Sequence, residues 1–251
     1  MQGLFTSFFK NVGRYAMLMS RVFVLPDRWR ETVRRTFQEM SALGLNSLGI
    51  VVIISIFMGV IMIIQMKLNF SNPFLPPYTT GMATREMLLL EFSSTVMSLI
   101  LAGKVGSNIA SEIGTMRITE QIDAMEIMGV NSANYLIFPK ITAMVTMMPL
   151  LCIVSMAMGF LGGYSVGWFS EIITTQEFEI GLQFGFRPFY VFYGIIKCVV
   201  YGFLIASVSS YYGYYVHGGA LDVGRSSTEA VVNSSVLILL ADIVLTNFLL
   251  A

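Results

Sequence analysis

Charged residues are scarce in this chain. Only 12% of its 251 residues are charged, whereas a soluble domain carries about 25%. Histidine occurs once and cysteine twice, so a metal cluster, a disulfide framework and a Cys–His catalytic pair lack their components. Fifteen basic residues balance fifteen acidic ones, which leaves no basic field to hold nucleic acid. We therefore predict no catalytic site, no metal site and no nucleic-acid partner.

Hydrophobic residues make up 55% of the chain and are concentrated in long runs. A helix needs about 20 apolar residues to cross the hydrocarbon core of a membrane. The stretches that meet this requirement are 45–66, 87–110, 141–169, 189–212 and 230–250. The predicted fold is therefore an all-α polytopic membrane protein with five transmembrane helices. Most lysine and arginine residues lie in the N-terminal stretch and in the connections on the same side of the membrane as that stretch. This distribution predicts a cytoplasmic N-terminus and a C-terminus outside the cytoplasm.

Residues 1–40 are predicted to precede a five-span domain that covers residues 41–251. Within residues 1–24, apolar side chains recur at helical spacing, and Lys10, Arg14 and Arg21 occupy the other face. This pattern is typical of an amphipathic helix that lies in the membrane interface. A cleaved signal peptide is the alternative, but the stretch lacks a clean apolar core followed by small residues. Pro26 is expected to end the first helix, and a second, more charged helix is expected to lead into the first span.

Three ionisable residues fall inside predicted spans at similar depth: Glu91, Lys197 and Asp242. A charge at the centre of a membrane helix costs roughly 2.5 to 3.5 kcal/mol. Mutual pairing that braces the bundle would explain them, and so would a polar wall of a cavity that receives a headgroup. We expect Asp242 to pair with Lys197 and Glu91 to face the cavity. An intramembrane aspartic protease is disfavoured, because the usual motifs around a close acid pair are missing.

The connection between the second and third spans, residues 111–129, is too polar to cross lipid and too regular for a loop. Ile118, Ile122 and Met125 share one helical face, which predicts a short amphipathic helix. Thr119 is the expected N-cap and Gly129 the expected end. The helix would either lie passively on the membrane or dock into a cytoplasmic protein. Its excess of carboxylates favours the protein, because the membrane surface is itself anionic.

Several stretches of this sequence resemble the signature of the MlaE family of permeases. They are AGKVGSNIASEIGTMRITEQIDAMEIMG (102–129), YLIFPK (135–140), GRSSTEAVVNSS (224–235) and DIVLT (242–246). The resemblance extends over nearly the whole chain from Leu45 onward. It implies the membrane subunit of an ABC-type lipid transport system of the Gram-negative inner membrane, which moves phospholipid between that membrane and a periplasmic MCE protein and so serves outer-membrane lipid asymmetry.

The same resemblance implies specific partners. Two copies of the chain would form a homodimer around an apolar, lipid-sized cavity open to the periplasm, with walls from the first, second and fifth spans. An ATPase of the MlaF type would bind the cytoplasmic face, possibly together with a STAS protein of the MlaB type, and an MCE protein of the MlaD type would receive the lipid. The chain has no GxxxxGK[ST] phosphate loop, so ATP and Mg²⁺ are expected in the partner ATPase and no cofactor in this chain.

In this family the helix at about 112–129 is expected to couple to the ATPase. The candidate coupling residues are Glu112, Arg117, Thr119, Glu120, Ile122, Asp123, Met125 and Glu126.

Two departures from the family pattern concern charge. Leu90 stands where the family commonly has an arginine next to the carboxylate, and whether Arg85 replaces it is open. Glu229 stands at a usually basic position, which leaves Arg225 as the candidate basic residue of the last cytoplasmic loop. Two other classes of protein also stay open. One is an ion-coupled secondary transporter that uses Glu91 or Asp242, and the other is a structural membrane anchor.

Overall fold

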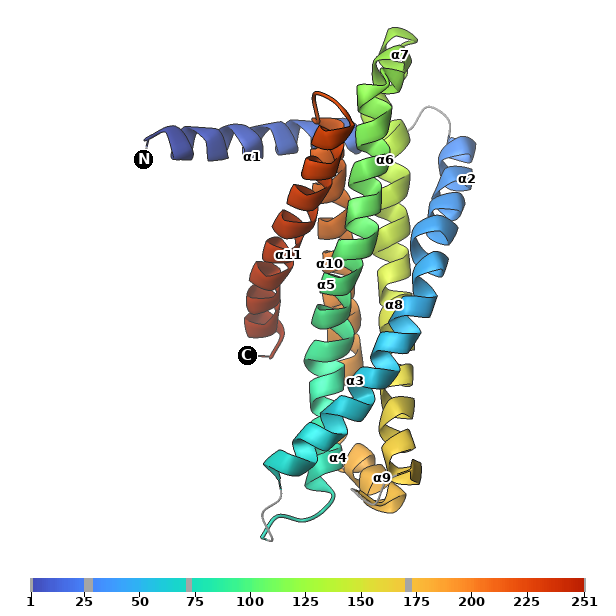
Figure 1. Ribbon diagram of the computed structural model, residues 1–251, viewed down its shortest axis with the longest axis vertical. Helices are drawn as coiled ribbons and strands as arrows, with labels where there is room; N and C mark the ends of the chain where they lie inside the picture. The colour runs from blue at the N-terminus through green and yellow to red at the C-terminus, as the bar shows by residue number, and fades with distance from the viewer. Residues whose placement is uncertain (1, 25–28, 71–73, 170–172, 251) are drawn as a thin grey trace.

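The computed structural model describes residues 2–24, 29–70, 74–169 and 173–250, with side chains from residue 9 onward. All regular structure within these residues is helical (Figure 1). Five helical stretches are long and apolar enough to cross a membrane, which confirms the predicted all-α, multi-pass architecture. They are Trp29–Asn69, Thr79–Ile118, Ser132–Phe169, Phe189–Tyr214 and Ala220–Leu250. Four of them begin earlier than predicted, because polar residues extend the helices beyond their apolar segments, and the fourth span begins at Phe189 as predicted.

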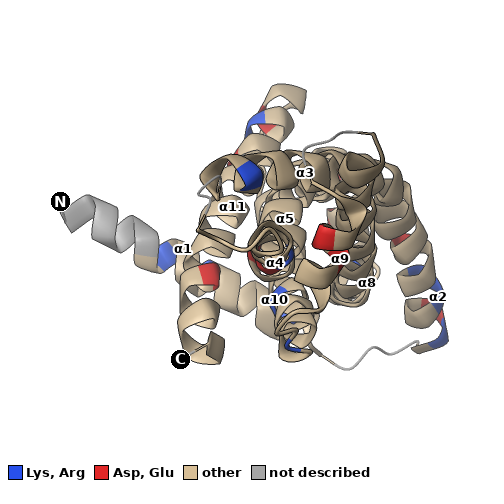
Figure 2. Cartoon of the chain, turned by 90° about the horizontal axis from the view of Figure 1, so that it is seen from below, with Lys and Arg blue, Asp and Glu red and all other residues tan. Residues whose placement is uncertain are grey.

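The first helix, α1 (Gln2–Val22), lies across one end of the bundle. Its C-terminal part packs into the core, where Leu18, Met19 and Val22 are buried. Figure 2 shows α1 and α2 (Trp29–Glu39) extending from opposite sides of the bundle. Residues 25–28, including the proline expected to end the first helix, lie outside the described residues. The two predicted N-terminal helices are present, and the interfacial position of α1 stays a prediction.

The first span is continuous but irregular. After α2, the chain passes through a π-helical turn, η1 (Met40–Gly44), and a 3₁₀ turn, η2 (Leu45–Ser47), before α3 (Leu48–Asn69) begins. This change of helical geometry lies in the half of the stretch Trp29–Asn69 that begins with α2, whose start is at the same end of the bundle as α1. We call that end the α7 end, after the helix that projects from it.

The second span alternates between α and π geometry. Its segments are α4 (Thr79–Met87), η3 (Leu88–Val96), α5 (Met97–Leu101), η4 (Ala102–Gly106) and α6 (Ser107–Ile118). The η3 and η4 segments are both π-helical. π-Helical turns inside α-helices are rare and frequently occur at functional sites.

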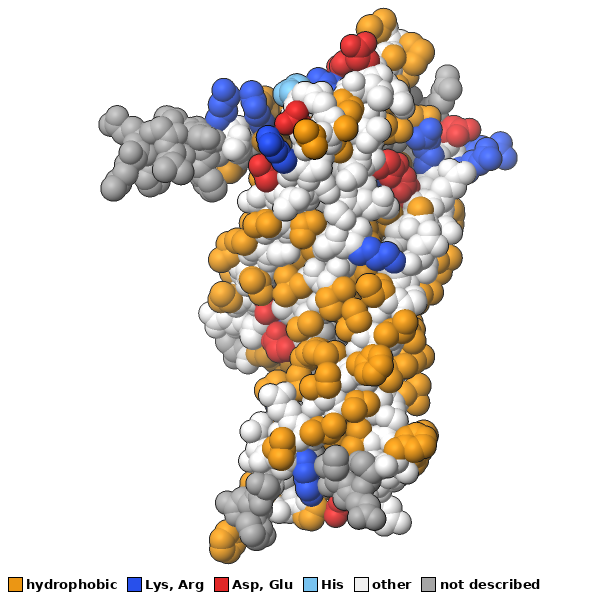
Figure 3. Space-filling model, in the orientation of Figure 1, with side chains coloured by type: hydrophobic (Ala, Val, Ile, Leu, Met, Phe, Trp, Pro, Cys, Tyr) orange, Lys and Arg blue, Asp and Glu red, His pale blue; other side chains and the backbone are white. Residues whose placement is uncertain are grey.

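The remaining helices complete the bundle. They are α7 (Gln121–Ile127), α8 (Ser132–Phe169), α9 (Thr175–Gln183), α10 (Phe189–Tyr214) and α11 (Ala220–Leu250). α8 packs against α3 and α10, whereas α11 packs against α10 and α6. The short helices α4 and α9 lie together at the end opposite α7, which we call the α9 end. Figure 3 shows apolar side chains over the middle of the bundle and charged ones mostly towards its ends.

Close backbone contact joins α3 to α8. A Cβ atom built on Gly59 would lie 2.0 Å from the carbonyl oxygen of Gly159, and one built on Gly162 would lie 2.1 Å from that of Ile56. Only glycine allows two helices to approach this closely. The small residues of α8 therefore serve packing within this chain.

Candidate functional site

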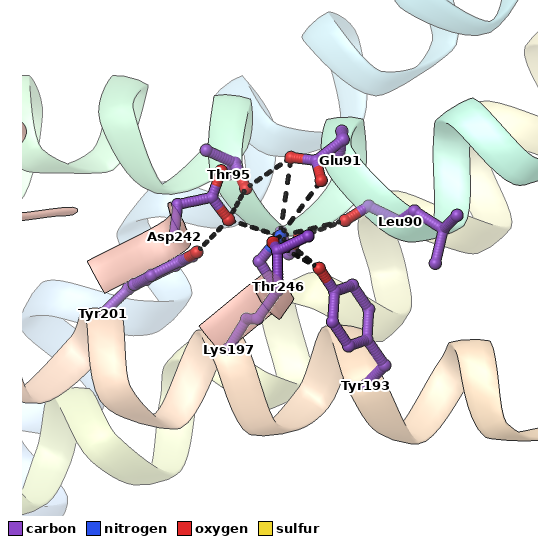
Figure 4. Close-up of polar contacts among 9 residues, drawn as sticks. Leu90, Glu91, Thr95, Tyr193, Lys197, Tyr201, Asp242 and Thr246 are labelled. Atoms are coloured by element: carbon purple, nitrogen blue, oxygen red, sulfur yellow. Dashed lines mark hydrogen bonds and ion pairs between the residues drawn. The ribbon is translucent and has the colours of Figure 1, made fainter. Parts of the chain in front are cut away.

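Three helices bring the ionisable residues of the spans together (Figure 4). Glu91 comes from η3, Lys197 from α10 and Asp242 from α11. Lys197 forms a salt bridge with Asp242, and its Nζ atom lies 3.3 Å from Oε1 of Glu91. The predicted pairing of Lys197 with Asp242 is thus present, and Glu91 belongs to the same cluster. We call these three residues the membrane cluster.

Neutral groups complete the surroundings of the lysine. The Lys197 ammonium donates to the Tyr193 hydroxyl at 3.0 Å and to the Leu90 carbonyl at 3.2 Å. It also lies 4.7 Å from the centre of the Tyr193 ring, within range of a cation–π interaction. A buried charge is tolerated only when its donors are satisfied. The Lys197 side chain is 0% exposed and meets this condition.

Hydroxyl groups link the two carboxylates. Tyr201 donates to Oδ1 of Asp242 at 2.7 Å. The Thr95 hydroxyl lies 3.2 Å from Glu91 and 3.2 Å from Asp242. Because a threonine hydroxyl has one hydrogen, it can donate to only one of them at a time. The cluster therefore has two alternative hydrogen-bond arrangements. In one the Thr95 hydroxyl donates to Glu91 and in the other to Asp242, over the same distance.

The three charged side chains differ in exposure. Asp242 is 17% exposed and Glu91 40% exposed. Two carboxylates surround one ammonium, so the cluster carries a surplus negative charge when all its members are ionised. That surplus sits closest to the surface at Glu91. Asp242 and Lys197 brace the helices, while Glu91 is the member that can contact a molecule outside the chain.

A fourth hydroxyl, that of Thr246, lies 2.7 Å from the Tyr193 hydroxyl. Sequence reasoning missed the hydroxyl residues of this cluster, although a simple spacing rule locates them. Residues four apart on a helix lie on the same face. Each missed residue stands four positions from a charged one: Thr95 after Glu91, Tyr193 and Tyr201 on either side of Lys197, and Thr246 after Asp242.

A small cavity lies between α3, η3, α5 and α8. Its lining includes Phe92 and the hydrogen-bonded pair Ser55 and Ser155. The volume is about 20 Å³, which is room for roughly one water molecule. A lipid does not fit there.

The helix predicted over 112–129 is divided in two. Residues 112–118 continue α6 of the second span, and α7 begins at Gln121. Between them, Glu120 has a left-handed backbone with φ of 61°. The expectation that Thr119 caps the helix is wrong, because its hydroxyl donates back to the Thr115 carbonyl of α6. Gly129, with φ of 77°, ends the segment as predicted.

The candidate coupling residues face different ways. Ile122 is fully buried in the main hydrophobic core, and Met125 packs against that core. Arg117 pairs with Asp123 at 2.7 Å and thereby fixes α7 to α6. Thr119 and Glu120 are exposed.

The apolar tip of α7 was not anticipated. Ile127 is 88% exposed and Met128 70% exposed. Exposed apolar side chains at the tip of a projecting helix are unusual unless another protein covers them. The only hint in the sequence is their position directly before Gly129.

Glu126, whose side chain is 39% exposed, joins α7 to the rest of the α7 end. One oxygen, Oε1, accepts hydrogen bonds from Arg21 at 3.0 Å and from Ser132 and Tyr214 at 2.9 Å each. Partial burial would raise the pKa of this carboxyl, but the hydrogen bonds from Tyr214, Ser132 and Arg21 outweigh that effect and lower it. A lowered pKa means that the ionised carboxylate holds α1, α8 and α10 to α7.

Two further candidates are placed by the structure. Glu112 forms a 2.7 Å salt bridge with Lys140 of α8. Arg225 is 79% exposed at the α7 end and lies 3.8 Å from Asp222.

Arg85 does not replace the arginine that is missing at position 90. Its side chain is 1% exposed, and it donates to the carbonyl oxygens of Leu182 and Phe184 at 2.8 Å each. These carbonyls belong to the C-terminal end of α9, where a cation is favourable. Arg85 therefore caps α9 and is shielded from any headgroup.

These features agree with the relatives of the chain. The model of a protein family described as permease MlaE matches residues 36–248. The chain belongs to the MlaE family. A probable ABC transporter permease protein of Rickettsia bellii is 36% identical over 210 residues, covering 84% of this chain and 81% of that protein. The intermembrane phospholipid transport system permease protein MlaE of Haemophilus influenzae is 28% identical over 243 residues, covering 95% and 92%.

A eukaryotic relative matches as well. The chloroplastic protein TRIGALACTOSYLDIACYLGLYCEROL 1 of Arabidopsis thaliana is 31% identical over 222 residues, covering 86% of this chain and 61% of that protein. Membership of the MlaE family makes the chain an ABC transporter permease, and the ATPase of such a transporter is a separate subunit. The chain is thus a transport subunit rather than an enzyme.

Proposed function

We propose that this permease moves phospholipid between the inner membrane and a periplasmic MCE protein of the MlaD type. A separate ATPase of the MlaF type, which binds ATP and Mg²⁺, supplies the energy, with a STAS protein of the MlaB type bound to that ATPase. The observation that carries the proposal is α7, a short helix that projects from the bundle with an exposed apolar tip at Ile127 and Met128. A helix that only lay on the membrane surface would not project from the bundle with its apolar tip exposed.

The orientation follows from charge. In our proposal the α7 end is cytoplasmic and the α9 end periplasmic, so the N-terminus is cytoplasmic and the C-terminus periplasmic. Arg21 of the basic N-terminal segment pairs with Glu126 of α7, and the positive-inside rule assigns that side of the membrane to the cytoplasm. The acidic and apolar surface of α7 then faces the ATPase.

The lipid path is assigned to a homodimer. The cavity beside η3 has a volume of about 20 Å³, too small for a lipid, and a larger hollow of about 700 Å³ between the end of α8 and the start of α9 is not lined by Glu91. We therefore place the lipid-sized space between chains. The outer face of α11 supports a second copy, because Ile243 is 68% exposed and Phe248 82% exposed. Glu91, 40% exposed beside α11, would line the space where the first, second and fifth spans of two chains meet.

The test is lipid transfer by the reconstituted complex. The permease and its ATPase are placed in vesicles that contain a fluorescent phospholipid, and transfer to the MCE protein is followed with and without ATP. Glu91→Gln should keep the complex assembled but reduce transfer, because it removes the surplus charge of the membrane cluster. Glu86→Gln makes the same change on the same span outside the cluster and serves as the control.

Two outcomes would contradict the proposal. Wild-type complex that hydrolyses ATP without moving lipid would remove phospholipid as the substrate. Transfer that continues without ATP and stops when an ionophore collapses the ion gradient would instead favour an ion-coupled transporter that uses Glu91 or Asp242.

A further inference from the structure

A second lysine-centred cluster lies inside the bundle towards the α7 end. Lys140 of α8 has a side chain that is 2% exposed. Its Nζ atom lies 2.8 Å from Oε1 of Glu39 and 2.7 Å from Oε2 of Glu112. Glu39 is the last residue of α2, and Glu112 belongs to α6. One ammonium thus joins the first, second and third spans.

This ammonium joins helices whose main packing partners differ, although α8 also packs against α10. α2 packs against α8, whereas α6 packs against α10 and α11. The bond from Lys140 to Glu112 is therefore a direct link between α6 and the α2–α8 pair. Buried ion pairs add little net stability compared with apolar residues, but they can select one arrangement of packed elements.

Both spans that pair with Lys140 change helical geometry close to it. Glu39 directly precedes η1, and η4 directly precedes α6. The two interruptions touch, because Lys104 of η4 donates to the Asn46 carbonyl of η2 at 2.5 Å. α6 therefore has a non-α turn at one end and carries α7 at the other, where Arg117 pairs with Asp123. These features describe a limb, α6 and α7 together, with a joint at η4.

We propose that Lys140 is a positioning residue for transport: it holds the α6–α7 limb against α2 and α8, and it passes a displacement of α7 to the first span. The charges make this contact reversible. When Glu112 moves away, Lys140 keeps Glu39 as a partner, so no buried lysine is left without a counter-charge. Glu112 is 43% exposed, against 21% for Glu39, so its carboxylate can be solvated on release.

The inference rests on the proposed function for the identity of the cargo, and its test separates motion from transfer. In the reconstituted complex, Lys140→Met should leave ATP hydrolysis in place while the lipid moved per ATP falls by about fivefold or more, the size of a weak energetic coupling between two sites. Lys140→Arg should restore most of the ratio, because a guanidinium can donate to both carboxylates. A residue needed only for folding would lower hydrolysis and transfer together.

If Lys140→Met fails to fold, Glu112→Gln tests the same role of Lys140. It leaves Lys140 paired with Glu39 and should also lower the lipid moved per ATP. Glu31→Gln, on the exposed surface of α2, is the matched control and should change nothing. Wild-type ratios in Glu112→Gln would overturn the proposal.

A distance measurement reports on the limb without reference to lipid. Spin labels at Phe37 of α2 and Thr115 of α6, both exposed, should give a narrow distance distribution in the nucleotide-free wild-type complex. Lys140→Met and Glu112→Gln should broaden it. An unchanged distribution in both variants would show that Lys140 does not hold the limb. Wild-type complex that changes this distance with ATP but moves no lipid would refute the proposed function and leave the role of Lys140 intact.

Discussion

Neutralising Asp242 tests whether the membrane cluster holds the helices together. Removing one partner of a buried ion pair costs about 3 to 5 kcal/mol, because the other charge is left buried and unpaired. Here the loss should be smaller. Lys197 keeps Glu91 at 3.3 Å and the Tyr193 hydroxyl at 3.0 Å, and an asparagine at 242 can still accept from Tyr201. We expect Asp242→Asn to lower the free energy of unfolding by about 2 kcal/mol.

The assay is thermal unfolding of the purified permease in detergent. A loss of about 2 kcal/mol corresponds to a fall in Tm of roughly 4 to 8 °C for a chain of this size. Asp222→Asn is the control. It lies on the same helix, and its carboxylate is 3.8 Å from the exposed Arg225, a surface pair worth about 0 to 1 kcal/mol.

The decisive comparison is a double-mutant cycle with Lys197→Met. Once the lysine is gone, Asp242 no longer neutralises a buried cation, so Asp242→Asn should cost about 1 to 2 kcal/mol less in that background. Losses that add to within about 0.5 kcal/mol would mean that the two residues act independently. The close contact between Lys197 and Asp242 would then carry no stabilising interaction.

Three further predictions concern other parts of the chain. Met128→Asp should release the ATPase from the permease in a copurification assay, since it puts charge on the apolar tip of α7; retention of the ATPase would show that the tip does not bind it. Arg85→Met should free the C-terminal end of α9, seen as faster amide hydrogen exchange over 181–184, whereas protection equal to wild type would contradict the capping role. The pKa of Glu126 is lowered, so the stabilisation that its carboxylate gives to the contact of α1 with α7 is complete above the ordinary glutamate pKa of about 4.3. This stabilisation is lost as the pH falls through the lowered pKa. A spin label on α1 should therefore gain mobility on acidification below about pH 4.3. Glu126→Gln should be mobile already at neutral pH, and a pH response identical to wild type would exclude this carboxyl.

The sequence predicts the five spans because lipid imposes one requirement, an apolar helix of sufficient length, that can be checked residue by residue. It also predicts that Lys197 pairs with Asp242, because isolated charges at membrane depth are too costly to leave alone. That Glu91, expected to face a cavity, also lies beside Lys197 is known only from the structure.

Contacts between residues far apart in the sequence could not be predicted from composition and spacing. Lys140 is visible in the sequence only as one of the basic residues beside a span, yet its two partners lie 101 and 28 positions away. Likewise, nothing near Arg85 indicates that it binds the carbonyls of residues about 100 positions later. The π-helical turns escaped prediction too, because no apolar periodicity distinguishes η3 from the α-helix around it.

The contact between Gly59 and Gly159 limits which parts of the bundle can separate. At that point the backbones of α3 and α8 are in direct contact. No side chain lies between them whose rotamer could change to let the two helices slide or move apart. The two helices therefore behave as a single rigid strut. α11 is at the other extreme, since only 11% of its most apolar segment is buried. Any opening of the bundle should consequently occur by displacement of α11, and a cross-link between α3 and α8 should leave that opening unaffected.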